Sequence, residues 1–108
     1  EFTLGENIGD LGGLAIAVKA YELSLDGEPA PVLDGYTGLQ RVFLGYAQAW
    51  RGKTRDEALR VRIKTDPHSP RQYRVNGVVR NVPEFYDAFE IAETDELYLP
   101  AEERVKIW

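Results

Sequence analysis

The chain has 108 residues, with 13 Lys and Arg against 18 Asp and Glu, a net charge of −5, one His, and neither Cys nor Met. A hydrophobic content of 44% with 29% charged residues excludes a disordered polymer and fits one ordinary globular domain. Without Cys, the chain forms no disulfide, thiolate nucleophile or sulfur-ligated metal site. With a single His, it cannot assemble the common two-His zinc site alone.

The composition also narrows the classes of partner. An acidic balance argues against nucleic acid, because phosphates favour a basic protein surface. The longest unbroken apolar run, Leu14–Val18, falls far short of the roughly 20 residues that span a bilayer. The sequence opens without a signal-peptide pattern, and the missing initiator Met suggests a piece of a longer protein.

Apolar side chains recur at helical spacing from Asn7 to Tyr21, which predicts a first helix, and a loop rich in Gly and Pro follows over residues 24–36. Four later segments open with a capping box, in which Ser, Thr or Asn is followed three residues on by Glu or Gln. These segments begin at Thr37, Thr54, Ser69 and Asn81. The helix behind the first of them is expected to stop at Gly52. We therefore predict a mainly α helical bundle with an irregular C-terminal tail.

Glu6 and Asp10 lie four residues apart near the start of the first predicted helix, so both side chains project from one face. Acids in a first turn commonly do no more than complement the helix dipole, and spacing alone favours that interpretation. The functional interpretation is a metal-binding carboxylate at Glu6 with an orienting carboxylate at Asp10. Both interpretations stay open at this point.

His68 stands in a loop between Pro67 and Pro70. A lone His in a loop is commonly a surface or capping residue, but a rigid loop also suits a preorganised hydrogen-bond donor. Arg74 follows on a helix, where a salt bridge with Asp66 is the simplest role. The sequence has no second His for a catalytic triad and no glycine loop for phosphate. The residues alone therefore predict a helical domain and no specific chemistry.

Several blocks of the sequence form a specific pattern when their order and spacing are considered together. The segment Gly5–Gly13 contains an E-x-x-x-D pattern, and further blocks lie at 43–52, 65–70, 73–77 and the terminal Lys106-Ile107-Trp108. In this order and spacing they resemble the neprilysin family of zinc metallopeptidases, which includes neprilysin, endothelin-converting enzyme and bacterial oligoendopeptidases of the O type. The resemblance spans essentially the whole chain. It implies that residues 1–108 are the C-terminal portion of a zincin, or thermolysin-like, catalytic domain.

The resemblance implies roles for three residues around a zinc ion. Glu6 matches the third zinc ligand of the family, and Asp10 matches the carboxylate that orients a zinc-binding His. His68 matches the imidazole that hydrogen-bonds the oxyanion of the tetrahedral intermediate. These roles suit one metal-activated water.

Four further residues match positions that serve the peptide substrate. Arg74 matches the guanidinium that holds the substrate carbonyl next to the cleaved bond, a task that suits its planar fork of donors. Asp66 is expected to fix Arg74 in place. Ala49 and Trp50 match positions that line the pocket for the apolar side chain after the scissile bond.

The chain departs from the family pattern in two respects. Val105 stands where many animal members have a disulfide-bonded Cys, which fits a bacterial member. The family's H-E-x-x-H helix, which supplies two His ligands and the general base, and its Asn-Ala substrate-backbone motif are not among these 108 residues. The resemblance therefore implies a parent zinc endopeptidase that cleaves small peptides before apolar residues. It also implies that this chain is inactive without the remainder of the catalytic domain.

A different class of function is a free-standing, non-catalytic helical interaction module. Such a module would not need Glu6, Asp10, His68 and Arg74 together at the family's spacing. An H-E-x-x-H helix upstream in the parent reading frame would distinguish the peptidase from the module. A piece of a larger catalytic domain exposes apolar surface that the remainder of the domain would cover. We therefore expect the chain to self-associate. The compartment stays open, because the resemblance fits a bacterial parent that is periplasmic, membrane-anchored, secreted or cytoplasmic.

Overall fold

The computed structural model describes residues 2–107, and within this range the chain forms five α-helices, one short 3-10 helix and no β-strand. The helices are α1 (Leu4–Ser24), α2 (Gly38–Ala49), α3 (Asp56–Thr65), α4 (Arg71–Val79), α5 (Pro83–Phe89) and η1 (Ala101–Glu103). The predicted mainly α fold is thus confirmed.

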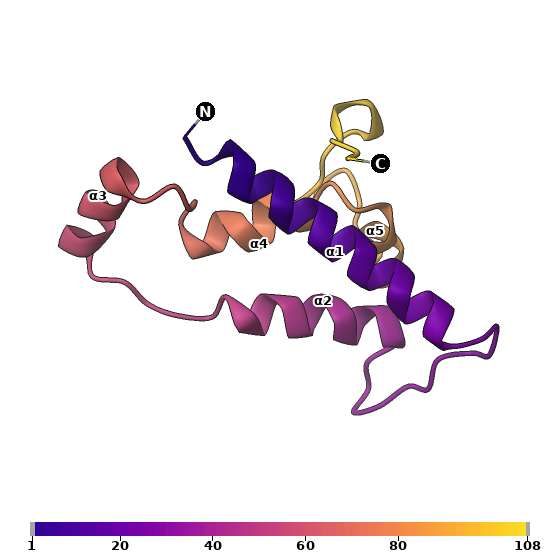
Figure 1. Cartoon of the computed structure of the whole chain (residues 1–108). Coiled ribbons are helices and arrows are strands. Elements are labelled where there is room, and N and C mark those ends of the chain that lie inside the picture. The colour runs from indigo at the N-terminus through magenta and orange to yellow at the C-terminus, as the bar shows by residue number, and fades with distance from the viewer. Residues whose placement is uncertain (1, 108) are drawn as a thin grey trace.

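Four of the helices pack together and the fifth stands apart. Helix α1 is the longest and packs against α2 and α4, while α2 also packs against α4 and α5 (Figure 1). The core is formed by nine buried side chains: Leu11, Leu14, Val18, Phe43, Val78, Val79, Val82, Phe85 and Tyr86. The rings of Phe43, Phe85 and Phe89 meet with centroids 5.3 to 6.3 Å apart, a spacing at which aromatic rings attract one another.

Helix α1 is longer at both ends than the predicted 7–21. It begins at Leu4, one turn earlier, and it ends where Asp26 and Gly27 adopt the left-handed region with φ of 50° and 83°. The predicted helix ends at Tyr21, the last residue of the apolar pattern at helical spacing. The chain continues as a helix until a residue pair that tolerates positive φ turns it, because no earlier side chain breaks the hydrogen-bond ladder.

Only one of the four predicted capping boxes forms. The hydroxyl of Thr37 accepts the backbone N–H of Gln40 at 3.3 Å, and the Gln40 side chain accepts the backbone N–H of Thr37 at 2.9 Å. The residues that cap α3, α4 and α5 are Arg55, Pro70 and Val82, and none of them makes a side-chain cap bond.

Two of the three failed boxes, those at Ser69 and Asn81, have a physical reason in the competing partners of their polar side chains. The Ser69 hydroxyl donates to Oδ1 of Asn7 at 2.9 Å instead of capping α4. The Asn81 side chain donates to the carbonyl of Gly77 at 2.7 Å and accepts the backbone N–H of Val105 at 2.8 Å. Tertiary contacts thus override a local pattern that is only weakly favourable.

The C-terminal tail is irregular, as predicted, and specific contacts hold it against the core. The Tyr86 hydroxyl donates to the carbonyl of Arg80 at 2.7 Å and accepts the backbone N–H of Leu99 at 2.9 Å. The Arg104 guanidinium lies 3.5 Å above the Tyr86 ring, a cation–π contact. Trp108, the last residue of the terminal block, lies outside the described residues.

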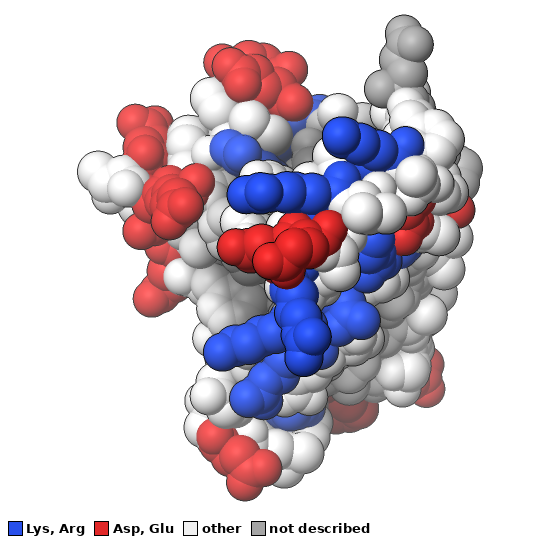
Figure 2. Space-filling view, turned by 90° about the vertical axis from the view of Figure 1, so that its left-hand side faces the viewer, with Lys and Arg blue, Asp and Glu red and all other residues white. Residues whose placement is uncertain are grey.

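Helix α3 projects from one end of the molecule and has no buried residue. Figure 2 looks onto this end, where Lys and Arg side chains gather around a group of acidic ones.

Among the residues that the structure describes, no helix combines the length and the hydropathy needed to cross a membrane.

The capping box yields a testable difference between two threonines. We expect Thr37→Ala to lower the free energy of unfolding by about 1 kcal/mol, because it leaves a backbone N–H of α2 without its partner. The matched control is Thr54→Ala, which removes a threonine that has the same sequence pattern but does not cap a helix. Urea unfolding of both variants measures the difference, and equal losses would contradict the assignment.

Candidate functional site

An ion pair between α1 and α4 lies at the centre of the candidate site. Arg74 donates from Nε to Oδ2 of Asp10 at 2.6 Å and from Nη2 to Oδ1 at 2.7 Å. The two side chains are only 11% and 10% exposed. The hydrogen bonds that Arg74 donates to Asp10 raise the pKa of Arg74 above its ordinary value, so the guanidinium stays charged. This bidentate geometry fixes the direction as well as the strength of the contact.

The partner of Arg74 differs from the one that the sequence predicted. We expected Asp66 to hold Arg74, and this was wrong, because Asp66 lies beside His68 and Arg62. Asp66 is the C-cap residue directly after α3, and its carboxylate binds its own chain neighbours, Arg62 one turn back and His68 two residues on. Asp10, one turn along α1 from Glu6, reaches the guanidinium instead.

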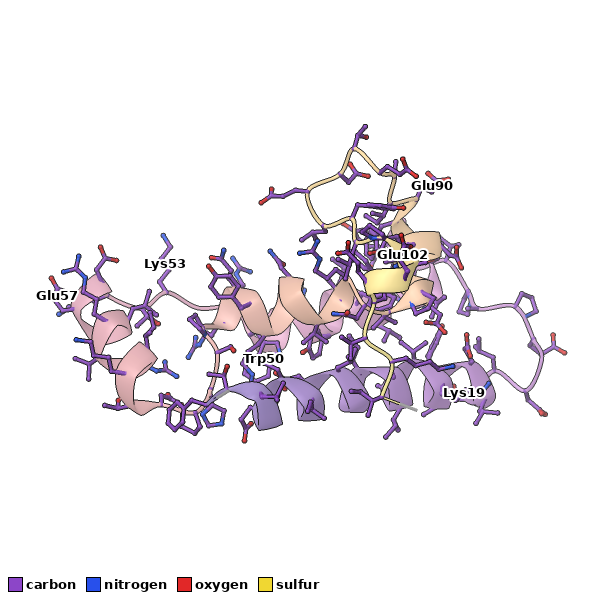
Figure 3. All side chains as sticks on the ribbon, turned by 90° about the horizontal axis from the view of Figure 1, so that it is seen from above. Lys19, Trp50, Lys53, Glu57, Glu90 and Glu102 are labelled. Atoms are coloured by element: carbon purple, nitrogen blue, oxygen red, sulfur yellow. The ribbon has the colours of Figure 1, made fainter. Side chains whose placement is uncertain are left out.

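Two aromatic residues at the end of α2 complete the surroundings of Arg74. Its guanidinium lies 4.0 Å above the Trp50 ring, and its backbone carbonyl accepts a hydrogen bond from the Tyr46 hydroxyl at 2.7 Å. The rings of Tyr46 and Trp50 meet edge to face at 6.4 Å. Figure 3 shows Trp50 between the ribbons of α1 and α4. Side chain and backbone of Arg74 are therefore both fixed.

The Glu6 carboxylate lies beside this pair and faces the imidazole of His68 and the guanidinium of Arg74. Its Oε2 is 3.2 Å from Nε2 of His68 and 3.5 Å from Nη2 of Arg74. The Glu6 side chain is 44% exposed, so it borders the surface rather than the core. Glu6, His68 and Arg74 come from three separate segments and meet at one point.

His68 is held between two carboxylates. Oδ1 of Asp66 accepts the backbone N–H of His68 at 3.0 Å and lies 2.5 Å from Nδ1 of its ring. These two contacts with His68, and a further hydrogen bond from Arg62, lower the pKa of Asp66 from 3.8 to about 2. Because Asp66 occupies Nδ1, the other ring nitrogen, Nε2, points toward Glu6. This pairing fixes the ring orientation, as a carboxylate does for many functional histidines.

The structure therefore brings together Glu6, Asp10, His68 and Arg74, with Asp66 behind the His. Ala49 is the last residue of α2 and is exposed, whereas Trp50 is half-buried under Arg74. Their role in a substrate pocket stays a prediction.

Sequence reasoning missed two contributors to this arrangement. Asn7 binds Ser69 and ties the start of α1 to the loop that carries His68. Tyr46 packs against the core as an apolar residue of α2, and the sequence predicted no part for it in the site. Its spacing of four residues from Trp50 places both on one side of α2, which was the available signal. The contact of Asn7 has no signal in the sequence.

The described residues supply too few ligands for a complete zinc site. No group of three or more His, Asp or Glu side chains within residues 2–107 is arranged to hold a metal ion. Glu6 fits the role of one zinc ligand, because carboxylate oxygens bind zinc and the Glu6 side chain is accessible at the surface. Within the described residues, Glu6 is thus a carboxylate that fits one position of a zinc centre.

Comparison with known proteins places these residues in a family. The profile of peptidase family M13 matches residues 1–105. This chain belongs to peptidase family M13. Neprilysin-1 of Caenorhabditis elegans is 44% identical over 95 residues, and human neprilysin is 40% identical over 110 residues. These alignments cover 83% and 98% of this chain but only 13% and 14% of the relatives, so the M13 chain spans about one seventh of their length.

A solved structure agrees closely with the M13 chain. The crystal structure of the Mycobacterium tuberculosis zinc metalloprotease Zmp1 in complex with an inhibitor superimposes with a TM-score of 0.98 at 61% sequence identity. The superposition covers 99% of this chain and 16% of that one. The resemblance inferred from the motif blocks is confirmed.

The buried ion pair of this M13 chain predicts a non-additive pair of substitutions. Asp10→Leu leaves the Arg74 charge buried without a partner, and we expect it to lower the free energy of unfolding by about 3 kcal/mol. The double variant Asp10→Leu/Arg74→Met removes both charges and is expected to recover most of that loss. Urea unfolding measures both, and a double variant less stable than Asp10→Leu would contradict the assignment.

The lowered pKa of Asp66 predicts an acid-side effect on stability. Because its pKa falls from 3.8 to about 2 on folding, ionised Asp66 contributes stability that is present above the unfolded value and lost as pH falls through the folded one. The melting temperature of the wild-type chain should therefore exceed that of Asp66→Asn near neutral pH. We expect the difference to shrink between about pH 4 and about pH 2. A difference that does not change with pH would contradict the contacts described.

Proposed function

We propose that the longer protein containing this chain is a zinc-dependent endopeptidase that hydrolyses small peptides before apolar residues. In this proposal, residues 1–108 form the C-terminal portion of its catalytic domain. The family and the similarity to a zinc metalloprotease support the reaction class. The remainder of the catalytic domain and a peptide substrate are the partners of the chain.

One observation carries the proposal, namely the convergence of three different chemical groups. Oε2 of Glu6 lies 3.2 Å from His68 Nε2 and 3.5 Å from Arg74 Nη2, although Glu6 is separated from them by more than sixty residues of sequence. A metal-ligating carboxylate, an imidazole donor and a guanidinium are the groups that metal-assisted peptide hydrolysis needs near the reacting carbonyl.

Each residue takes a separate part in the proposed reaction. Glu6 would hold the zinc ion, which, when bound, polarises the substrate carbonyl and acidifies a water molecule. His68, oriented by Asp66, donates a hydrogen bond to the oxygen on which negative charge develops. Arg74 donates to the carbonyl next to the cleaved bond, so it binds and orients the peptide. Ala49 and Trp50 would contact the apolar side chain that follows the cleaved bond.

Asp10 has two tasks in this proposal. Its carboxylate fixes Arg74 through two hydrogen bonds, and its oxygens keep lone pairs that can accept an N–H from an imidazole. A His of the remainder of the catalytic domain would be oriented in this way. The carboxylate would thus align a zinc ligand and a substrate-binding residue together.

The proposal is tested with the full-length parent protein. We expect Glu6→Gln to reduce bound zinc and to lower kcat/KM for a small peptide by at least about a hundredfold, because even an indirect partner of a metal ligand is worth about ten- to a hundredfold. The matched control is Glu96→Gln, which neutralises an exposed carboxylate on the loop after α5. Zinc content by mass spectrometry and peptide hydrolysis are measured on both. Full zinc and full activity in Glu6→Gln would contradict the proposal.

The 108-residue chain alone is the second arm of this experiment. With one fitting ligand, it is expected to hydrolyse no peptide and to bind no zinc stoichiometrically. Tight, stoichiometric zinc binding by the isolated chain, or peptide hydrolysis that His68→Ala abolishes, would overturn this part of the proposal. The predicted self-association of the chain stays a prediction, which exposed Leu4, Ile16 and Leu23 along α1 support.

A further inference from the structure

The backbone of Arg74 has an attachment of its own, distinct from those of its side chain. The hydroxyl of Tyr46, in the last turns of α2, donates to the carbonyl oxygen of Arg74 at 2.7 Å. Tyr46 and Arg74 are separated by 28 residues of sequence, so this bond joins α2 to the first half of α4. The sidechain of Arg74 is bound elsewhere, by Asp10 and above Trp50.

Helix α4 needs such an attachment because it is short. It has nine residues, and a helix of fewer than about twelve residues is marginal without tertiary contacts. Its buried apolar residues, Val78 and Val79, lie in its last turn. The first half of α4, which carries Arg74, therefore depends on polar contacts for its position.

The Tyr46 side chain reaches both the backbone of Arg74 and the aromatic ring below its guanidinium. The Tyr46 ring meets Trp50 edge to face at 6.4 Å, and the Arg74 guanidinium lies 4.0 Å from the Trp50 ring centroid. Tyr46, Trp50 and Arg74 thus form one packed unit, with Tyr46 in contact with the other two. A shift of Tyr46 would move both supports of the guanidinium.

We propose that Tyr46 is a positioning residue, whose hydroxyl fixes the backbone of Arg74 so that its guanidinium meets the substrate carbonyl. This inference rests on the proposed function, since Arg74 there binds the peptide. Tyr46 itself does not touch the substrate. Burial, and to a lesser degree the charge of Asp10, raise the pKa of Tyr46 to about 12, so the phenol remains a donor throughout the neutral range.

The hydroxyl can be removed without removing the ring. Tyr46→Phe keeps the contact with Trp50 and deletes only the hydrogen bond to Arg74. Tyr86→Phe is the matched control, because Tyr86 also donates to a backbone carbonyl, that of Arg80, at 2.7 Å, and is more deeply buried than the partly buried Tyr46. Tyr86 lies in α5 and contacts the C-terminal tail, away from Glu6 and His68.

The test is a double-mutant cycle on peptide hydrolysis by the full-length parent protein. We expect Tyr46→Phe to raise KM about fivefold, which corresponds to the loss of one typical hydrogen bond. We expect kcat to change by less than about twofold, because Arg74 holds the bound peptide both before and during the reaction. In an Arg74→Ala background, Tyr46→Phe should change KM no further, since it acts only through Arg74. Tyr86→Phe should leave KM unchanged even where it lowers the melting temperature.

Three results would overturn the inference. An unchanged KM in Tyr46→Phe would show that the hydroxyl does not position Arg74. An equal rise of KM in the wild-type and Arg74→Ala backgrounds, or an equal rise in Tyr86→Phe, would show a general structural effect. A parent protein that hydrolyses no peptide before any substitution would instead contradict the proposed function, and this inference with it.

Discussion

The bidentate ion pair between Asp10 and Arg74 is the contact on which the arrangement of the site depends. It joins the long helix α1 to the short helix α4 with both side chains almost fully buried. A buried pair of this kind adds little net stability, because removing two charges from water offsets most of their attraction. Its effect is on geometry, since breaking it leaves a buried charge and so penalises any other placement of α4.

Further polar contacts are arranged around that pair. Glu6, one turn before Asp10, reaches Arg74 and His68, while Asn7 binds Ser69 and holds the loop of His68 against α1. Asp66 then fixes the ring of His68 from the other side. The first two turns of α1 thus provide a carboxylate for the candidate metal, an amide for the loop and a carboxylate for the guanidinium. In the proposed function, these residues are the contribution of a chain with one His and no Cys to metal-dependent chemistry.

The sequence predicted the helices better than it predicted the contact partners of the candidate site residues. Apolar periodicity located α1 and α2, because their stripes bury Leu14, Val18 and Phe43 in the core. The capping pattern failed at Ser69, whose hydroxyl binds a residue more than sixty positions away. The expected pair of Asp66 with Arg74 failed because Arg74 binds Asp10, 64 positions away, while Asp66 binds its own chain neighbours. Local spacing specifies which side chains share a helix face, but it does not specify which other helix lies opposite them.

The central claim is that Glu6, His68 and Arg74 act on one substrate carbonyl beside a zinc ion, and a structure of the full-length protein tests it most directly. The measurement is a crystal structure with zinc and an inhibitor that resembles the tetrahedral intermediate. Our account predicts a Glu6 carboxylate oxygen at about 2.0 to 2.2 Å from the zinc. It also predicts that the His68 imidazole and the Arg74 guanidinium donate to oxygens of the inhibitor, with Asp10 still bound to Arg74. A zinc ion bound without Glu6, or an inhibitor that neither His68 nor Arg74 contacts, would contradict it.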